Sequence, residues 1–158
     1  MNRPLKLAFA LGLGCGLSLA VVRGNETTAA KLPLSPEISS QAAKVLREYK
    51  GVKLGLKREQ VHAALGPPES SNEASEDFKL TGEDTMTVRY ENGEVKAIQL
   101  AFQDAKNAPA WRDVVGDAEI TELASGAKTA RKVLSEEKFW VSIYQNKDAT
   151  MIRITISR

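Results

Sequence analysis

The feature that most constrains the fold is an alternating segment followed at once by Asn92-Gly93. Over Thr85–Glu91 every second residue is apolar, which predicts a β-strand with one buried face. Asn-Gly is a strong hairpin signal, so a second strand is expected directly after it. For the apolar residues of both strands to share one face, we expect a three-residue loop, Glu91–Gly93, with Gly93 left-handed. These apolar positions are Met86, Val88 and Tyr90 before the loop and Ile98, Leu100 and Phe102 after it.

Two helices are expected before this hairpin. The first begins at Ser35-Pro36, a capping residue followed by a proline suited to the first helical position, and runs through Tyr49 to Gly51. The second covers Lys57–Leu65, where apolar residues recur at helical spacing. Gly66 and the two prolines after it end this second helix.

The second half of the chain repeats the same plan. Residues 60–69 (QVHAALGPPE) align with residues 110–119 (AWRDVVGDAE), and residues 86–102 align with residues 140–156. The paired positions include Gly66 with Gly116, Tyr90 with Tyr144, and Ile98 with Ile152. Two matches in the same order, each on the same kind of element, predict an internal duplication.

We therefore expect an α+β fold made of two tandem related units, residues 36–106 and 107–158. Each unit would be a short helix, or a helix pair, packed on an antiparallel β-sheet. Ala127–Leu134 would be the first strand of the second unit, although the spacing of its Lys and Arg residues also permits a helix.

The N-terminal residues have the pattern of a targeting signal. Leu7–Val22 is uncharged and follows a basic start, so residues 1–30 predict a secretory signal peptide; the alternative is an uncleaved anchor that keeps the protein near a membrane. Residues 31–35 would be a tether. Cys15 follows Gly14 as in a lipobox, but Gly12 stands where leucine is expected, so we do not expect a lipoprotein. An exported, periplasmic or envelope-associated protein is therefore predicted.

Composition excludes several classes of protein. The chain of 158 residues has one cysteine and one histidine, too few ligands for a Cys/His zinc site. Its net charge of +2 comes from the N-terminal 30 residues, so no concentrated basic face for nucleic acid is indicated. We expect no metal, no cofactor and no catalytic residue.

One stretch carries a family resemblance. Gly51–Pro68 (GVKLGLKREQVHAALGPP) and Tyr90–Val95 (YENGEV) resemble the SmpA/OmlA family of small bacterial envelope lipoproteins, one of which belongs to the outer-membrane β-barrel assembly machinery. Two such units in tandem are similar in plan to the β-lactamase inhibitory proteins. The resemblance implies protein binding or envelope scaffolding rather than catalysis.

Three groups of polar residues are candidate sites. His62 is expected to be solvated or packed, since no partner for it is evident in the sequence. A cluster of carboxylates between helix and hairpin is expected to be a solvated loop, with an acid–base pair of a hydrolase as the alternative. A basic run is expected to be a mixed surface, with an anionic lipid or acidic partner as the alternative. The carboxylate cluster consists of Glu73, Glu76, Asp77, Glu83 and Asp84. The basic run consists of Lys128, Arg131, Lys132 and Lys138.

The segment 138–144 is the candidate partner-binding strand, because it is apolar at almost every position. By the repeat alignment Trp140 and Tyr144 face the helices, which leaves the alternate apolar residues open. The reverse assignment, with Trp140 and Tyr144 outside, is left open, as are a strand buried on both faces and an edge buried in a homodimer. The candidate partner-binding residues are Phe139, Trp140, Val141, Ile143, Tyr144, Met151 and Arg153.

These observations predict an exported, non-catalytic protein-binding or scaffolding module of the bacterial cell envelope, whose partner is another envelope protein. The alternative is a periplasmic module that binds a small ligand or lipid between helix and sheet. A hydrolase that uses the carboxylate cluster is a third hypothesis.

Overall fold

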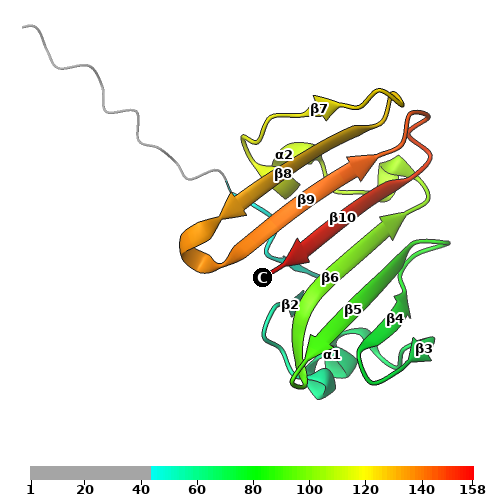
Figure 1. Cartoon of the computed structure of the whole chain (residues 1–158). Helices are drawn as coiled ribbons and strands as arrows, with labels where there is room; N and C mark the ends of the chain where they lie inside the picture. The colour runs from blue at the N-terminus through cyan, green and yellow to red at the C-terminus, as the bar shows by residue number, and fades with distance from the viewer. Residues whose placement is uncertain (1–43) are drawn as a thin grey trace, which may run out of the picture. The chain divides into compact units, whose positions relative to one another are not determined.

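The computed structural model describes residues 44–158. The expected leader (1–30), the tether (31–35) and Cys15 lie outside this range. Within the range, no helix is long and apolar enough to cross a membrane. The described residues form a large antiparallel sheet, two short α-helices and a small two-stranded ribbon (Figure 1).

The main sheet has eight strands in the order β3-β4-β5-β6-β10-β9-β8-β7, and every neighbouring pair is antiparallel. The strands β6 and β10 therefore meet in the middle, with Leu100 opposite Ile154. The bounds are β3 Ser70–Ser71, β4 Ser75–Lys79, β5 Thr85–Glu91, β6 Glu94–Phe102, β7 Thr121–Glu122, β8 Lys128–Leu134, β9 Phe139–Gln145 and β10 Ile152–Ser157. The α+β class is thus observed, and Ala127–Leu134 contains a strand rather than a helix.

The predicted hairpin is β5–β6, but its loop is shorter than expected. Glu91 pairs with Glu94, so the loop is Asn92-Gly93 alone, with φ of 54° and 78°. Positive φ at both residues is the two-residue hairpin turn that Asn-Gly favours. A bulge between Arg89 and Tyr90 corrects the register, so Met86 and Ile98 do share the buried face, as expected.

The first predicted helix is wrong over the residues that the structure describes. Residues 44–47 form no helix, and the chain continues as a ribbon of β1 (Glu48–Tyr49) and β2 (Val52–Lys53). Lys50 and Gly51, both at positive φ, make the turn between them. Of the apolar residues that predicted the helix, Val45 is in the core, and Leu46 and Tyr49 pack against it.

The second predicted helix is confirmed as α1, Arg58–Leu65. The side chain of Gln60 accepts the Lys57 backbone N–H at 2.9 Å, which satisfies the start of the helix. Gly66, at φ 85°, ends it. The short α2, Trp111–Val115, ends in the same way at Gly116.

The core lies between one face of the sheet and the elements that cover it. These are α1, α2, the segment 44–56 and the 3-10 helix η1 (Ala105–Asn107). Figure 1 looks onto the opposite face, which they leave open. The fully buried side chains of the sheet include Met86, Val88, Val95, Ile98, Leu100, Val141, Ile143, Ile154 and Ile156.

Candidate functional sites

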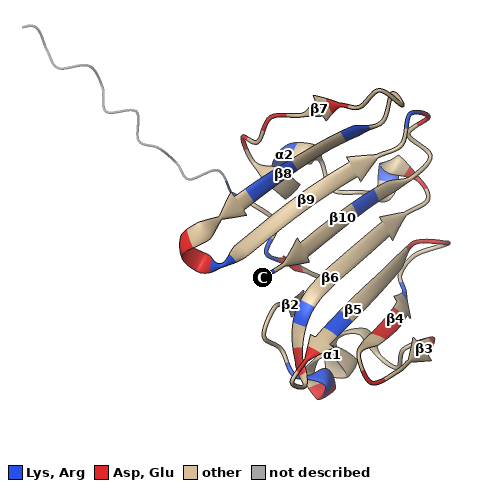
Figure 2. Ribbon diagram, in the orientation of Figure 1, with Lys and Arg blue, Asp and Glu red and all other residues tan. Residues whose placement is uncertain are grey.

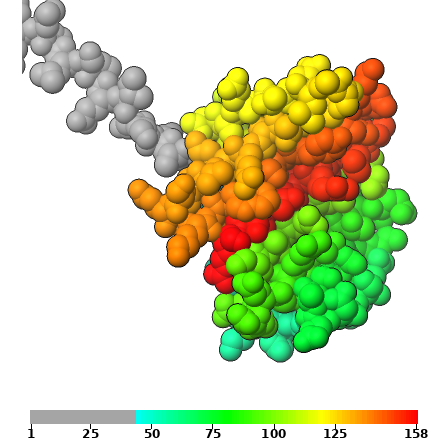
Figure 3. All heavy atoms as spheres, in the orientation of Figure 1, coloured from blue at the N-terminus to red at the C-terminus, as the bar shows by residue number. Residues whose placement is uncertain are grey.

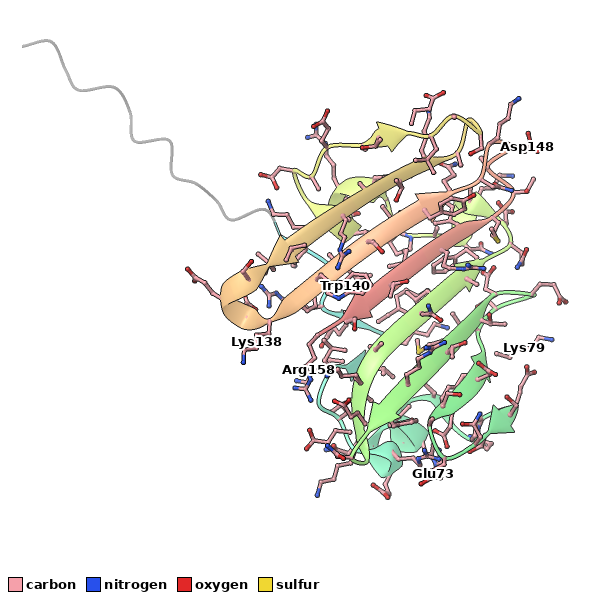
Figure 4. All side chains as sticks on the ribbon, in the orientation of Figure 1. Glu73, Lys79, Lys138, Trp140, Asp148 and Arg158 are labelled. Carbon is pink, nitrogen blue, oxygen red and sulfur yellow. The ribbon has the colours of Figure 1, made fainter. Side chains whose placement is uncertain are left out.

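The described helices and the segment 44–56 leave one face of the sheet uncovered (Figure 1). Figure 3 shows it as one continuous surface, with β10 (red) between the first four strands (green) and β8–β9 (orange). Inner and outer residues alternate along each strand. On β9, Val141 and Ile143 face the core, so Trp140, Ser142 and Tyr144 face outward and are half-buried. Trp140 is labelled in Figure 4.

The β-sheet register gathers a compact group of side chains around Ser142 on this face. Ser142 lies between Arg131 on β8 and Thr155 on β10, and Tyr144 lies opposite Arg153. The Arg131 guanidinium carbon is 4.2 Å from the centre of the Trp140 ring, a cation–π contact. We call this group the arginine–aromatic patch: Arg131, Trp140, Ser142, Tyr144, Arg153 and Thr155.

The charge of the patch is positive. The strands β8, β9 and β10 contain no Asp or Glu. Within residues 44–158, neither Arg131 nor Arg153 takes part in an ion pair, and both are exposed. Figure 2 shows blue segments on β8 and β10 and red mainly at turns and strand ends. Carboxylates of this face lie on other strands: Glu91 on β5 pairs with Lys96 at 2.8 Å, and Asp77 on β4 accepts hydrogen bonds from Thr87 and Ser70.

On β9, the candidate partner-binding strand, the structure reverses the expected assignment of inner and outer residues. Phe139, Val141 and Ile143, expected outside, are buried against the helices. Trp140 and Tyr144, expected inside, lie on the open face together with Arg153. The error came from aligning Tyr90 with Tyr144: Tyr90 is 9% exposed and on the core side, whereas Tyr144 is on the open side. Met151 precedes β10 and donates its backbone N–H to Asn146 Oδ1 at 3.0 Å.

A buried carboxylate forms the second site. Glu76 on β4 is 1% exposed and accepts hydrogen bonds from four side chains. Tyr90 Oη lies 2.7 Å from Oε2, His62 Nε2 lies 3.0 Å from both oxygens, and Ser71 Oγ lies 3.0 Å from Oε1. Arg58 Nη1 lies 3.1 Å from Oε1, and its guanidinium carbon lies 4.4 Å from the centre of the Tyr90 ring.

The groups around Glu76 favour the ionised form of its carboxyl. Burial alone would raise the pKa of the Glu76 carboxyl, but the hydrogen bonds from Tyr90, His62 and Ser71 and the charge of Arg58 together lower it. A general acid needs the opposite shift. The cluster therefore ties α1 to β3, β4 and β5 by charge and hydrogen bonds.

The other carboxylates of the predicted cluster do not converge. Glu73 and Glu83 are exposed. Asp77 accepts hydrogen bonds from Thr87 at 2.6 Å and Ser70 at 2.7 Å, which lower its pKa. Asp84 is buried, with the Gln103 backbone N–H and Asn107 Nδ2 each at 2.8 Å. The expectation of a solvated loop is thus wrong for Glu76 and Asp84, and the paired acid and base of a hydrolase are not assembled by these residues.

The sequence analysis did not identify the partner of His62, because it considered only residues close to His62 in the chain. The partner is Glu76, which lies on another element and 14 residues away. The signal that could have found it is the alternation of β4, where Glu76 and the buried Phe78 share one face. The His62 ring also meets the Phe78 ring edge to face, at 6.2 Å between centres.

A hollow of about 640 Å³ lies beside α2. It lies beside the helix and the segment that follows it, rather than between helix and sheet as the small-ligand alternative requires. Apolar side chains, two cations and the carboxylates of Asp113 and Asp117 line it, and Ile120 at its rim is 50% exposed. The lining includes Lys44, Trp111, Arg112, Val115, Ala118 and Ile120.

Comparison with known proteins adds no identification. The chain matches no family model and no curated protein. Among solved structures, a cysteine-rich secretory protein from Staphylococcus aureus subsp. aureus Mu50 is similar at a TM-score of 0.39 and 8% identity. The match covers 73% of this chain and 48% of that one. A likeness this limited identifies neither a family nor a function.

Proposed function

We propose that this protein is an exported, non-catalytic protein-binding or scaffolding module of the bacterial envelope, and that its partner docks on the open sheet face. The observation that carries the proposal is the arginine–aromatic patch on a sheet face that no described element covers. Trp, Tyr and Arg are the residues most enriched at binding hot spots. The resemblance of residues 51–68 to the SmpA/OmlA family supports the envelope setting.

The size of the face suits a protein. Eight strands spaced about 4.8 Å apart, with central strands about 20 Å long, present on the order of 700 Å². A stable protein–protein interface buries about 800 Å² on each partner. A small molecule would occupy only a fraction of such a surface.

The finer architecture that goes with this function is a tandem of two related units, residues 36–106 and 107–158. The β6–β10 register supports it: Ile98 pairs with Ile156 and Phe102 with Ile152, symmetrically about Leu100 and Ile154. The helix-then-four-strands order of both halves and the matching ends at Gly66 and Gly116 also support it. Joining two such sheets at their last strands is what makes the face large enough for a protein.

Site-specific photo-crosslinking in intact cells tests the proposed face. A benzoylphenylalanine at Ser142 lies in the centre of the patch, and one at Glu59, exposed on α1, is the control on the covered side. We expect a discrete protein adduct from position 142 and none of that mass from position 59. The same adduct from both positions, or none from position 142, would refute docking on this face.

The hollow beside α2 favours a second candidate function, binding of a small, largely apolar ligand. Its volume falls within the range of small-molecule sites, and Trp111, Val115 and Ile120 give it an apolar lining in which the cations and carboxylates balance. The probe is 8-anilinonaphthalene-1-sulfonate, whose fluorescence should rise on binding and lose most of that rise in Ile120→Glu. The matched control is Leu123→Glu, an exposed residue that does not line the hollow. Equal fluorescence in both variants would remove this candidate.

A further inference from the structure

We infer that the partner presents an acidic protein surface, whose carboxylates pair with Arg131 and Arg153 on either side of the β9 aromatics. This inference rests on the proposed docking face and specifies the chemistry of what docks there. It follows from the position, neighbours and unpaired charge of these two arginines.

Arg131 is held ready for a carboxylate. Its guanidinium lies over the Trp140 ring at 4.2 Å, which restricts the side chain while leaving its N–H groups at the edge of the plane free to donate. Arginine in this state binds a carboxylate through two parallel hydrogen bonds and loses little further conformational freedom. No carboxylate of residues 44–158 is paired with it.

Arg153 provides a second cation at a defined spacing. It lies on β10, two strands from Arg131 on β8 and two residues further along the sheet, so their backbones are about 12 Å apart. Its register neighbours are Tyr144 on one side and Ala101 on the other, and neither neutralises it. The hydroxyls of Ser142 and Thr155 lie between the two arginines and can donate to the same partner.

A second copy of this chain fits this face poorly. A two-fold contact centred on this patch places the patch of one copy against the same patch of the other. The arginines of one patch would then oppose those of the other, and β8, β9 and β10 offer no carboxylate to separate them. Like charges brought together across an interface are unfavourable. An acidic partner is complementary to the same surface.

The test uses the full chain in intact cells, with the photo-crosslinker at Ser142 as the probe. Arg131→Gln and Arg153→Gln each remove one patch cation, and Lys106→Gln removes an exposed cation outside the sheet as the charge-matched control. We expect each arginine variant to lower adduct yield about tenfold, as loss of a charge-assisted contact predicts, and Lys106→Gln to leave it unchanged. The crosslinked partner peptide, read by mass spectrometry, should contain Asp or Glu. Unchanged thermal unfolding should show that the variants are folded.

The other outcomes separate this inference from the proposed function. An adduct that forms equally in all three variants overturns the acidic partner and keeps docking on this face. An adduct of twice the chain's mass overturns it in favour of a second copy. An adduct with lipid or glycan instead of protein overturns both, as does the absence of any adduct at position 142.

Discussion

At the residue scale, Glu76 shows how one charged side chain can be satisfied inside an otherwise apolar layer. A buried carboxylate is costly unless its oxygens are hydrogen-bonded and its charge is compensated. Here Tyr90, His62, Ser71 and Arg58 supply both, and none of the buried side-chain polar atoms in residues 44–158 lacks a hydrogen-bond partner. Removing any one of these groups therefore leaves the others without a hydrogen-bond partner or a counter-charge.

Replacing Glu76 with Gln should destabilise the fold. Gln keeps the shape but leaves Arg58 without its counter-charge and weakens the bond from Tyr90. We expect the free energy of unfolding to fall by about 2–4 kcal/mol, measured by urea denaturation. Glu73→Gln is the matched control, since that side chain is exposed, and should change stability by less than about 0.5 kcal/mol. Equal effects of both changes would contradict this account.

The same site predicts the acid sensitivity of the protein. The folded-state pKa of Glu76 lies below its ordinary value of 4.5, so near that pH the unfolded chain binds more protons than the folded one. The stabilisation is therefore complete above about pH 4.5 and is lost progressively as the pH falls through the folded pKa. The groups facing the carboxylate are Arg58, His62 and Tyr90.

Urea unfolding between pH 3 and pH 6 measures this dependence. The wild-type protein should lose stability toward pH 3, and Glu76→Gln should lose less, because the titrating group has been removed. Asp77, Glu91, Asp117 and Glu137, whose pKa values are also lowered, contribute slope in the same direction. A Glu76→Gln variant with an unchanged slope would show that this carboxylate is not the responsible group.

At the element scale, one face of β9 packs in the core and the other lies on the proposed docking face. Val141 is fully buried, whereas Tyr144, three residues later, lies on the open face. Val141→Lys places a charge in the core and should abolish folding, seen as loss of the cooperative thermal transition. Tyr144→Lys should stay folded and lose the adduct formed from position 142. If both variants unfold, the strand is buried on both faces and the proposed docking face is wrong.

Over residues 44–51 the predicted first helix does not form, because turn chemistry overrides apolar spacing. Val45 and Tyr49 fit a helical period, yet Lys50-Gly51 at positive φ reverses the chain between two short strands. Contacts far along the chain then hold the segment: the Leu46 N–H donates to the Val114 carbonyl at 3.0 Å, and Arg47 pairs with Glu137. None of these partners is visible from local sequence.

At the scale of the whole molecule, export remains the first prediction to check. If residues 1–30 contain a cleaved leader, the protein recovered from the envelope should be about 20–30 residues shorter than the full chain by intact mass spectrometry. A full-length mass would establish an anchor instead. A chain beginning at a lipid-modified Cys15 would show that the protein is a lipoprotein, against our expectation.

The sequence by itself determined the elements whose cause is local. The alternation of Thr85–Glu91, the Asn92-Gly93 turn and the glycine that ends α1 each act within a few residues, so the hairpin and the helix could be predicted. The α+β class followed from them. The internal duplication stays a proposal, and the alignment on which it rests assigned the wrong face to β9.

Only the tertiary structure decided which face of β9 is open and which groups meet at Glu76. A shift of one residue moves every side chain of a strand to the other face, and here the pairing with β10 sets it: Ile143 opposite Ile154, Tyr144 opposite Arg153. Likewise, Glu76 meets His62 because β4 lies beneath α1, a relation that no local spacing encodes. Contacts between distant segments are set by the packing of the whole sheet, and so the candidate site emerged from the fold rather than from a motif.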